Sequence, residues 1–389
     1  MSGLSVWKKF VAAGVGFLLF AGGLRTADAA VFSPESFTLG NGLQVVVVTN
    51  RRAPVATMVV YYRVGAMDEP AGKSGLAHYF EHLMFKGTKT LAPGEFSSIV
   101  ARNGGRDNAF TSQDYTGYVT SFAADRLDLM LKLEADRMTG LRLTPEDIEP
   151  ERKVVLEERL SRVDNNPGAQ LAEQAAATLY SNHPYRIPII GWAHEIEALT
   201  REDLLAFYQA WYTPNNAVIV VSGDVSVDDV RPMVERHFGP LPARALPERP
   251  VWQEPPRSAE RLVTLAHPRV RQPAWSRRFL APSYASIETA VEAEIDRLLD
   301  TGVTEDEVKM AIERLQAEAI FARDSLSTPP RILGNALMTG QTIADVEAWP
   351  ERIGAVTVEA VNAAARELLS TGGAVTTRLT PKAQPEDKS

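Results

Sequence analysis

Runs of apolar residues separated by turn residues predict strands in the first part of the chain. Phe37–Val48 contains two β-rich runs on either side of Asn41-Gly42, a dipeptide typical of a tight hairpin turn. Val55–Val64 is rich in β-branched and aromatic residues and is predicted to be a third strand. A polar loop then leads into a segment with helical periodicity. Strands that lead directly into a helix are typical of a domain built from a sheet with helices packed on it.

The apolar positions of that segment recur at the spacing of a helix: Leu76, Phe80, Leu83 and Met84. The same segment contains His78-x-x-Glu81-His82, which is the zinc-binding motif His-Glu-x-x-His in reverse order. On a helix, His78 and His82 lie one turn apart on one face and can bind a single Zn²⁺. Glu81 follows His78 by three residues, so its carboxylate also points toward the metal and can take a proton from a zinc-bound water.

The alternative is a chance match on an ordinary amphipathic helix. The chain has six His among 389 residues, so such a motif is expected by chance in about one chain in a hundred. We therefore interpret this helix as part of a zinc site.

The next patterns predict a helix at 92–103, strands within the Thr-, Tyr- and Phe-rich stretch 108–122, and a helix at 127–138. This order continues the mixture of strands and helices that begins the chain. It predicts that the zinc helix is packed within a mixed layer domain.

Thr144-Pro145 has the signature of a helix start, a capping residue followed by Pro at the first helical position. Pro150 offers a second possible start. The helix carries Glu151 and Glu158, which are seven positions apart and therefore share a face. By itself this pattern is more typical of a solvated acidic helix paired with Arg and Lys. A zinc site with only two His needs a third protein ligand, however, and either carboxylate is a candidate for that position.

Six prolines within residues 240–256 indicate a linker: Pro240, Pro242, Pro247, Pro250, Pro255 and Pro256. On this basis we expect the domain that carries the zinc motif at 30–239 and the Pro-rich linker at 240–256. A C-terminal domain is expected at 257–380, followed by a disordered tail at 381–389.

The two sides of the linker resemble each other in sequence. Thr200-Arg-Glu-Asp in the first half aligns with Thr357-Val-Glu-Ala in the second. In both copies an apolar run begins 17 positions after this Thr, at Ala217 and at Ala374. We therefore interpret the chain as a duplicated domain.

The second copy is shorter than the first. Phe37 and Thr144 are 107 positions apart in the first copy, whereas Arg261 and Thr304 are 43 positions apart in the second. About 60 residues near the start of the second copy are therefore missing. Because no His-x-x-Glu-His occurs in it either, we expect the second half to be a truncated, non-catalytic copy.

Composition and charge narrow the class of protein. With 45% hydrophobic and 23% charged residues, the chain has the composition of an ordinary globular protein. Its net charge of −8 and the absence of a basic patch argue against nucleic acid as a partner. The chain has no Cys, which excludes disulfides and a thiol nucleophile and fits an oxidising compartment.

The N-terminus has the pattern of a secretory signal peptide. Lys8 and Lys9 precede the apolar run Phe10–Leu24, and Ala27-Asp28-Ala29 matches an A-x-A cleavage site. We predict a signal peptide at 1–29 and a mature protein in the periplasm or outside the cell, hence in the bacterial cell envelope. The alternative is an uncleaved anchor, but an apolar run of this length is short for a membrane span. After cleavage we expect no stable membrane span.

Taken together, these features resemble the pitrilysin/insulinase family of inverted-motif zinc metallopeptidases (inverzincins). The chain is most similar to the short bacterial members related to mitochondrial processing peptidase. The resemblance is carried by Asn41-Gly42-Leu43, Gly75-Leu-Ala-His78-x-x-Glu81-His82, Phe85-Lys-Gly-Thr88, Asn108-Ala-Phe-Thr111, Glu151-Arg-x-Val154-Val155-x-x-Glu158 and Pro214-Asn-Asn216 through Gly223-Asp224.

The resemblance implies that His78, His82 and Glu158 are the zinc ligands and that Glu81 is the general base. It implies that Glu151 supports the site from the second shell of side chains without being an obligatory ligand. The implied fold is α+β, with two homologous α/β sandwich halves, each a sheet with packed helices, of which the C-terminal half is incomplete.

A substrate site is implied as well. In the family, an edge strand binds the substrate peptide as an added β-strand. The matching residues here are Asn108, Ala109, Phe110 and Thr111.

The chain departs from the family in its second half. Family enzymes supply an Arg and a Tyr to the active site from the early part of the second copy, and that part falls in the missing stretch after Ser283-Tyr284. Some short members work as pairs in which one subunit carries the zinc motif and the other the Arg/Tyr pair. We therefore expect a homologous partner subunit that supplies both residues.

The predicted function is that of a zinc-dependent endopeptidase that hydrolyses peptides or unfolded polypeptides. One alternative is a non-catalytic structural or partner subunit of a peptidase complex, which the truncated second half favours. Another is a periplasmic peptide-binding module, which would use the edge strand but would not need Glu81.

Overall fold

The computed structural model describes residues 31–255, 259, 261–279, 295, 297–369 and 374–381. The expected signal peptide and the stretch around Ser283-Tyr284 lie outside these ranges, as does most of the expected tail. None of the helices in the described part is long and apolar enough to cross a membrane.

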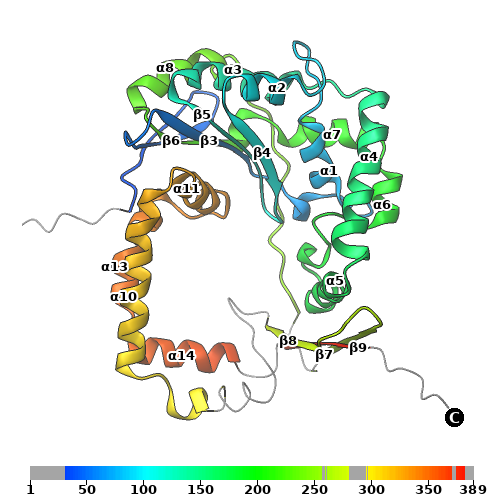
Figure 1. Ribbon diagram of the computed structural model, residues 1–389, viewed down its shortest axis with the longest axis vertical. Coiled ribbons are helices and arrows are strands. Elements are labelled where there is room, and N and C mark those ends of the chain that lie inside the picture. The colour runs from blue at the N-terminus through cyan, green and yellow to red at the C-terminus, as the bar shows by residue number, and fades with distance from the viewer. Residues whose placement is uncertain are drawn as a thin grey trace, which may run out of the picture.

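A six-stranded mixed sheet forms the centre of the first half (Figure 1). Its strands follow the order β1-β2-β6-β3-β5-β4. Their bounds are β1 Glu35–Thr38, β2 Gln44–Thr49, β3 Val55–Tyr62, β4 Arg106–Thr111, β5 Thr116–Ala123 and β6 Ala217–Gly223. Strands β2 and β6 are parallel, and the other neighbours are antiparallel.

The predicted hairpin at Asn41-Gly42 is confirmed, because β1 and β2 pair antiparallel across this turn. Gly42 has a φ of +89°, and a Cβ atom there would come within 2.9 Å of Asn215 Cβ. The Asn41 side chain donates hydrogen bonds to the carbonyl oxygens of Phe238 and Leu241 at 2.7 and 2.9 Å. The turn therefore fastens the start of the sheet to the end of the first half.

Helices cover one face of the sheet. They are α1 Leu76–Leu83, α2 Glu95–Arg102, α3 Leu127–Gly140, α4 Pro145–Arg159, α6 Ala193–Ala198, α7 Arg201–Trp211 and α8 Val227–Phe238. Helix α5 (Pro167–Leu179) instead packs against the smaller sheet of the second half. Helix α4 begins at the first of its two candidate starts, because Thr144 and Asp147 form a capping box there, and Pro150 lies inside the helix. Alternate residues of β3 face this core, including Met58, Val60 and Tyr62.

The opposite face of the sheet is covered by a helix from the second half, α11 (Thr328–Met338). Leu333 and Leu337 of this helix are buried against the residues of β3 and β6 that point away from the main core. Gly334 is required here, since a Cβ atom would lie 2.0 Å from the ring of Tyr61. The two halves are therefore packed into one molecule by an element that crosses between them (Figure 1).

A smaller sheet repeats part of the first. Strands β7 (Arg261–His267), β8 (Ala274–Phe279) and β9 (Ala374–Pro381) follow the order β7-β9-β8. The first pair is parallel and the second antiparallel, as in β2-β6-β3. This shared topology confirms two related halves, and β9 includes Pro381, the first residue of the expected tail.

The second half is shortened between β8 and the helix that follows it. In the first half, the positions 63–144 between β3 and α4 hold α1–α3, β4 and β5. In the second half, only positions 280–304 separate β8 from the corresponding α10 (Glu305–Phe321). The second half also contains α12 Ile343–Glu347, α13 Trp349–Gly354 and α14 Val358–Leu369. The second half is therefore incomplete, as predicted.

Candidate metal centre and cleft

The helix that carries the His motif is capped at its N-terminus by a side chain from outside the helix. Its N-cap residue is Gly75, at a φ of +83°, which has no side chain to bond the first N–H groups. The carboxylate of Glu69 takes this role and accepts hydrogen bonds from the N–H groups of Gly75 and Ala77 at 3.0 and 2.7 Å. Burial raises the pKa of Glu69 well above its ordinary value, and the two hydrogen bonds from the helix offset part of that rise.

Helices α1 and α4 bring His78, His82 and Glu158 together. One ligand atom from each of these side chains lies within 4.8 Å of the others. Glu158 Oε2 is 3.2 Å from His82 Nε2 and 3.7 Å from His78 Nε2. Two imidazoles and one carboxylate are the ligand set of many catalytic zinc sites, which keep a fourth position for water or substrate. The geometry of these residues therefore fits a zinc ion.

The pKa values of the two His are shifted in opposite directions. Burial, with a smaller effect of the His82 charge, lowers the pKa of His78 to about 3, so its ring is neutral at neutral pH. Its Nδ1 is buried and has no hydrogen-bond partner among the described residues. Burial also lowers the pKa of His82, but the hydrogen bond and charge of Glu151 outweigh burial and raise it.

Glu151 lies beside the group and contacts only one of its members. Its Oε1 is 2.9 Å from His82 Nδ1, and its Oε2 is 2.5 Å from Lys86 Nζ. The hydrogen bond to His82 is the main reason that the pKa of Glu151 is lowered. A proton held on Nδ1 by this carboxylate leaves the lone pair of His82 Nε2 free to bind a metal.

Glu81 points from α1 toward β4. Its Oε2 accepts a 2.6 Å hydrogen bond from the hydroxyl of Thr111. Burial raises the pKa of Glu81, and the Thr111 bond offsets part of that rise. A carboxylate whose pKa is moved toward neutrality is suited to take and return a proton.

These side chains line a cleft of about 630 Å³. Asn108–Thr111 of β4 form one wall, and Ile189 and Ile190 lie on its lining as well. Strand β4 is the last strand of its sheet, so one of its edges pairs with no strand of the described residues. The ring of Phe110 also packs edge-on against Tyr61 and Tyr115, which anchors the strand.

The structure therefore brings together every residue that the sequence suggested for the site. It adds six others to the lining of the cleft: Phe85, Lys86, Arg162, Val163, Ile189 and Ile190. Lys86 bonds to Glu151, and Arg162 bonds to Glu158 Oε1 at 2.8 Å. The spacing of Arg162 four positions after Glu158 on a helix is a signal for such a pair. Ile189 and Ile190 gave no signal, because a loop residue has no periodicity that assigns it to a cleft.

Two family models match the chain. Residues 44–192 match the insulinase model (peptidase family M16), and residues 198–290 match the model described as the peptidase M16 inactive domain. The chain therefore belongs to the insulinase family of peptidases (peptidase family M16).

Individual relatives agree with this assignment. The chain is 36% identical to the zinc protease PqqE of Helicobacter pylori over 289 residues, which are 73% of this chain and 65% of that protein. It is 32% identical to the probable mitochondrial-processing peptidase subunit beta of Schizosaccharomyces pombe over 56% of this chain and 47% of that protein. The chain therefore spans less than two thirds of the length of these curated relatives.

A solved structure shows the likeness in three dimensions. The crystal structure of a protease from Helicobacter pylori superposes with a TM-score of 0.82 at 28% identity, covering 90% of this chain and 99% of that chain. The shared arrangement includes most of the second half as well as the first. The expected family and the expected fold class are both confirmed.

Proposed function

We propose that the protein is a zinc-dependent endopeptidase of the bacterial cell envelope that hydrolyses peptides or unfolded polypeptides. The observation that carries this proposal is the placement of Glu81 next to the group formed by His78, His82 and Glu158, in a cleft bordered by an edge strand.

In this proposal, His78, His82 and Glu158 hold the metal, and Glu151 fixes the tautomer and orientation of His82. Bound zinc supplies a Lewis acid that polarises the scissile carbonyl and lowers the pKa of a water. Glu81 takes the proton of the attacking water and later passes it to the leaving amine. Thr111 holds the Glu81 carboxylate in one orientation while it does so.

The substrate class follows from β4. A peptide that adds to this edge must be extended, since its backbone has to pair with the N–H and C=O groups of Asn108–Thr111. Folded proteins offer few extended segments that are free to pair. The site is therefore suited to peptides and unfolded chains.

We also propose a role for each domain of the chain. Residues 30–239 form the catalytic domain, residues 240–256 link it to the second half, and residues 257–380 form a non-catalytic domain. The signal-like pattern of residues 1–29 supports export to the periplasm or the medium.

A homologous partner subunit completes the proposal. The second half lacks the stretch from which family members supply an Arg and a Tyr to the substrate. One relative of this chain is itself named as a subunit, the beta subunit of a processing peptidase. We infer that the partner of this chain supplies the Arg/Tyr pair.

The test is zinc content and peptide hydrolysis of single variants, measured with and without a homologous subunit. Glu81→Gln keeps the shape of the side chain but cannot accept a proton, so hydrolysis should fall by about 10²–10⁴-fold while zinc is retained. Unchanged turnover would remove Glu81 from the mechanism.

Removal of the ligands tests the metal. The double variant His78→Ala/His82→Ala should lose its zinc, because one carboxylate cannot hold the ion. His194→Ala is the matched control, since the side chain of His194 is 79% exposed and lies outside the cleft. Full zinc occupancy in the double variant would contradict the assignment.

A second candidate function is a structural subunit without turnover. The incomplete second half and the match to an inactive-domain model favour it. The two functions separate in one experiment, because the structural subunit would show no hydrolysis even with zinc bound and the homologous subunit present. A peptide-binding module would instead bind peptide without hydrolysing it, in the wild type as well as in Glu81→Gln.

A further inference from the structure

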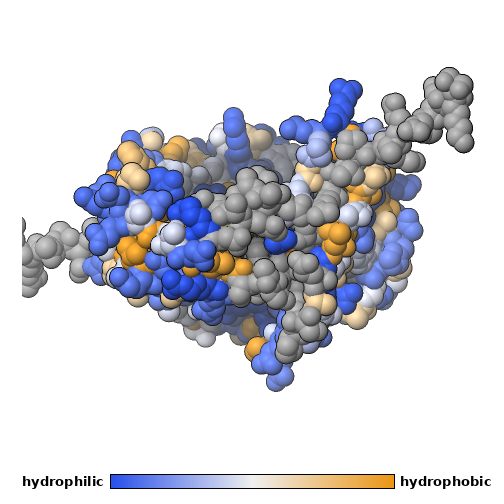
Figure 2. Space-filling model, turned by 90° about the horizontal axis from the view of Figure 1, so that it is seen from below, coloured by the Kyte–Doolittle hydropathy of each residue, from blue (hydrophilic) through white to orange (hydrophobic). Residues whose placement is uncertain are grey.

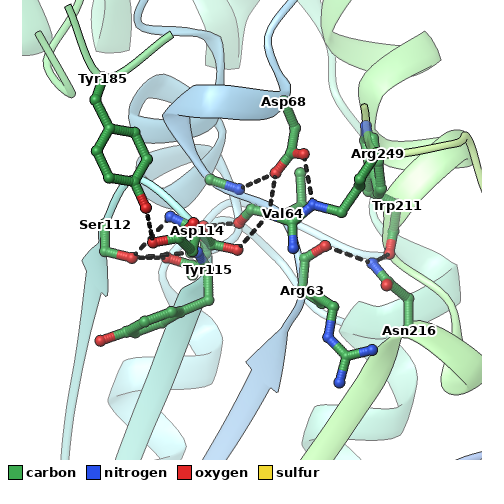
Figure 3. A network of polar contacts seen from close by, with 12 residues as sticks. Arg63, Val64, Asp68, Ser112, Asp114, Tyr115, Tyr185, Trp211, Asn216 and Arg249 are labelled. Carbon is green, nitrogen blue, oxygen red and sulfur yellow. Dashed lines mark hydrogen bonds and ion pairs between the residues drawn. The ribbon is translucent and has the colours of Figure 1, made fainter. Parts of the chain in front are cut away.

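The segment between the two halves is bound closely to the first half. Within this segment, Arg249 forms a two-pronged ion pair with Asp68, at 2.7 Å from Nε to Oδ1 and 2.8 Å from Nη2 to Oδ2. The same Nη2 donates a 2.8 Å hydrogen bond to the carbonyl oxygen of Asp114 (Figure 3). Arg249 thus contacts two separate parts of the first half.

The carboxylate of Asp68 is buried and depends on the charge of Arg249. Its side chain is 3% exposed, and burial raises its pKa, which Arg249 counteracts. Asp68 ends a short 3-10 helix, η1 (Ala66–Asp68), whose N–H groups donate to the turn between β4 and β5. These bonds run from Ala66 to Ser112 at 3.1 Å and from Met67 to Gln113 at 2.9 Å. Arg249 therefore fastens η1 and the turn 112–115, which follows Thr111 directly.

A second contact of the segment lies a few residues further on. The carboxylate of Glu254 accepts hydrogen bonds from the N–H groups of Ser181, Asn182 and His183, at 2.8, 2.9 and 2.5 Å. These residues begin the loop that runs through a 3-10 helix, η4 (Pro184–Arg186). The loop then passes through Ile189 and Ile190, which line the cleft, before α6 begins at Ala193.

The turn and the loop are also joined to each other. The hydroxyl of Tyr185 donates to Asp114 Oδ2 at 2.5 Å, and Gln113 Nε2 donates to the carbonyl oxygen of Ile187 at 3.2 Å. In Figure 3 the side chains of Tyr185 and Arg249 approach the turn from opposite sides. The segment, the turn and the loop form a closed ring of polar contacts beside the cleft.

We propose that residues 249–254 act as a strap that sets the position of both lining segments of the cleft. Arg249 and Glu254 are its positioning residues, and neither touches the metal group. Through the turn, the strap holds Thr111 and hence the orientation of Glu81; through the loop, it holds Ile189 and Ile190. The connection to the second half is therefore coupled to peptide binding. This inference rests on the proposed function.

The strap strengthens peptide binding because it orders the cleft before the peptide binds. A peptide loses affinity when the segments that contact it must first be ordered, because that entropy is lost on binding. Charge-assisted hydrogen bonds from Arg249 and Glu254 are among the stronger contacts available to such loops. Their removal should therefore weaken peptide binding more than it weakens the fold.

The test uses Glu254→Ala, with Glu248→Ala as the matched control. Glu248 lies in the same segment, is exposed, and makes no hydrogen bond or ion pair with the rest of the described chain. Hydrogen–deuterium exchange should become about tenfold faster at the amides of 181–183 in Glu254→Ala, because their acceptor is lost. If the ring couples the two segments, amides of the turn 112–115 should also exchange faster.

Peptide affinity is the second measurement. In the Glu81→Gln background, an unstructured fluorescent peptide should bind about three- to tenfold more weakly when Glu254→Ala is added. Zinc content should not change, and Glu248→Ala should behave like its parent. Faster exchange confined to 181–183, with unchanged peptide affinity, would overturn the strap.

Arg249 needs a paired variant, since Arg249→Ala alone leaves the buried Asp68 carboxylate unpaired. Asp68→Asn/Arg249→Ala removes that charge while the amide oxygen still accepts from Gly65 N–H. This double variant should weaken peptide binding. The single variant Arg249→Lys, in which Asp68 is intact, should weaken it less, because Lys keeps the charge but not the two-pronged geometry of Arg. Absence of peptide binding in Glu81→Gln itself would refute the proposed function. In that case, hydrogen–deuterium exchange at the amides of 112–115 would by itself show whether the strap positions the turn.

Discussion

The hydroxyl of Thr111 donates a 2.6 Å hydrogen bond to Oε2 of Glu81, which ties the edge strand β4 to the helix that carries the His motif. One bond therefore links the wall where a peptide would bind to the carboxylate that would move its protons. The site is a joint product of a strand and a helix that lie 30 positions apart in the chain.

The first prediction concerns this bond. Thr111→Val keeps the size of the side chain but removes the hydroxyl, so Glu81 loses its orientation. Hydrolysis, measured as kcat/KM, should fall about tenfold. Thr111→Ser is the control and should keep most of the activity because it keeps the donor. Equal activity of the Val and Ser variants would show that the bond has no role in turnover.

Glu151→Gln tests how the metal is held. The amide cannot match a carboxylate as partner of His82 Nδ1, so zinc affinity should fall about 10–100-fold. Competition with a chelator of known affinity measures this directly. Glu157→Gln changes an exposed residue on the same helix and should leave the affinity unchanged. A Glu151→Gln variant with wild-type affinity would remove this residue from the site.

A pH dependence is expected from Asp203. It bonds Lys73 at 2.8 Å and caps α7 through Thr200. Burial raises the pKa of Asp203, but these hydrogen bonds outweigh burial and lower it below 3.8. A lowered acid pKa stabilises the fold above pH 3.8, and this contribution is lost as the pH falls through the lowered value. Urea unfolding should show Asp203→Asn less stable than the wild type at pH 7, with the difference shrinking toward pH 3. A constant difference would contradict the assignment.

The fourth prediction is that this chain alone is a poor peptidase. The missing stretch of the second half predicts that apolar residues of α10, namely Ile312, Leu315 and Ile320, lie exposed. Ile320 is 61% exposed, whereas Ile312 and Leu315 are partly buried within the second half. Met310 and Phe321, at 63% and 71% exposed, are the other large apolar residues of α10 that are exposed. Seen from the end that bears α14, apolar residues lie in separate patches among hydrophilic ones (Figure 2).

A partner that supplies the missing Arg and Tyr should raise the rate by about 10²-fold or more, as expected for an added oxyanion donor. Peptide hydrolysis and light scattering of the purified chain, with and without a homologous subunit, measure rate and assembly together. Full activity of a monomer would show this prediction to be wrong.

The last prediction concerns processing. Cleavage after Ala29 gives a mature chain that begins at Ala30. Mass spectrometry of the exported fraction should find this N-terminus, because the A-x-A pattern directs the signal peptidase there. An intact Met1 in a cytosolic fraction would contradict it.

Local sequence was sufficient for the parts of the site that lie on one element. His78, Glu81 and His82 share a helix, and helical spacing alone places them on one face. The Asn41-Gly42 turn and the capping box at Thr144 were likewise predictable, because neighbours in sequence determine their geometry. The duplication was visible for the same reason, since matched spacing survives in the sequence.

The packing of distant elements decided the rest. Glu151 and Glu158 share one face of α4, and their spacing alone leaves open which carboxylate approaches both His. The way α4 lies against α1 brings Glu158 to both rings and leaves Glu151 beside His82 Nδ1. Helix α11 covers the far face of the first sheet, and Glu254 reaches a loop more than 70 positions away. Such contacts depend on shape and burial across the whole fold, for which no local pattern exists.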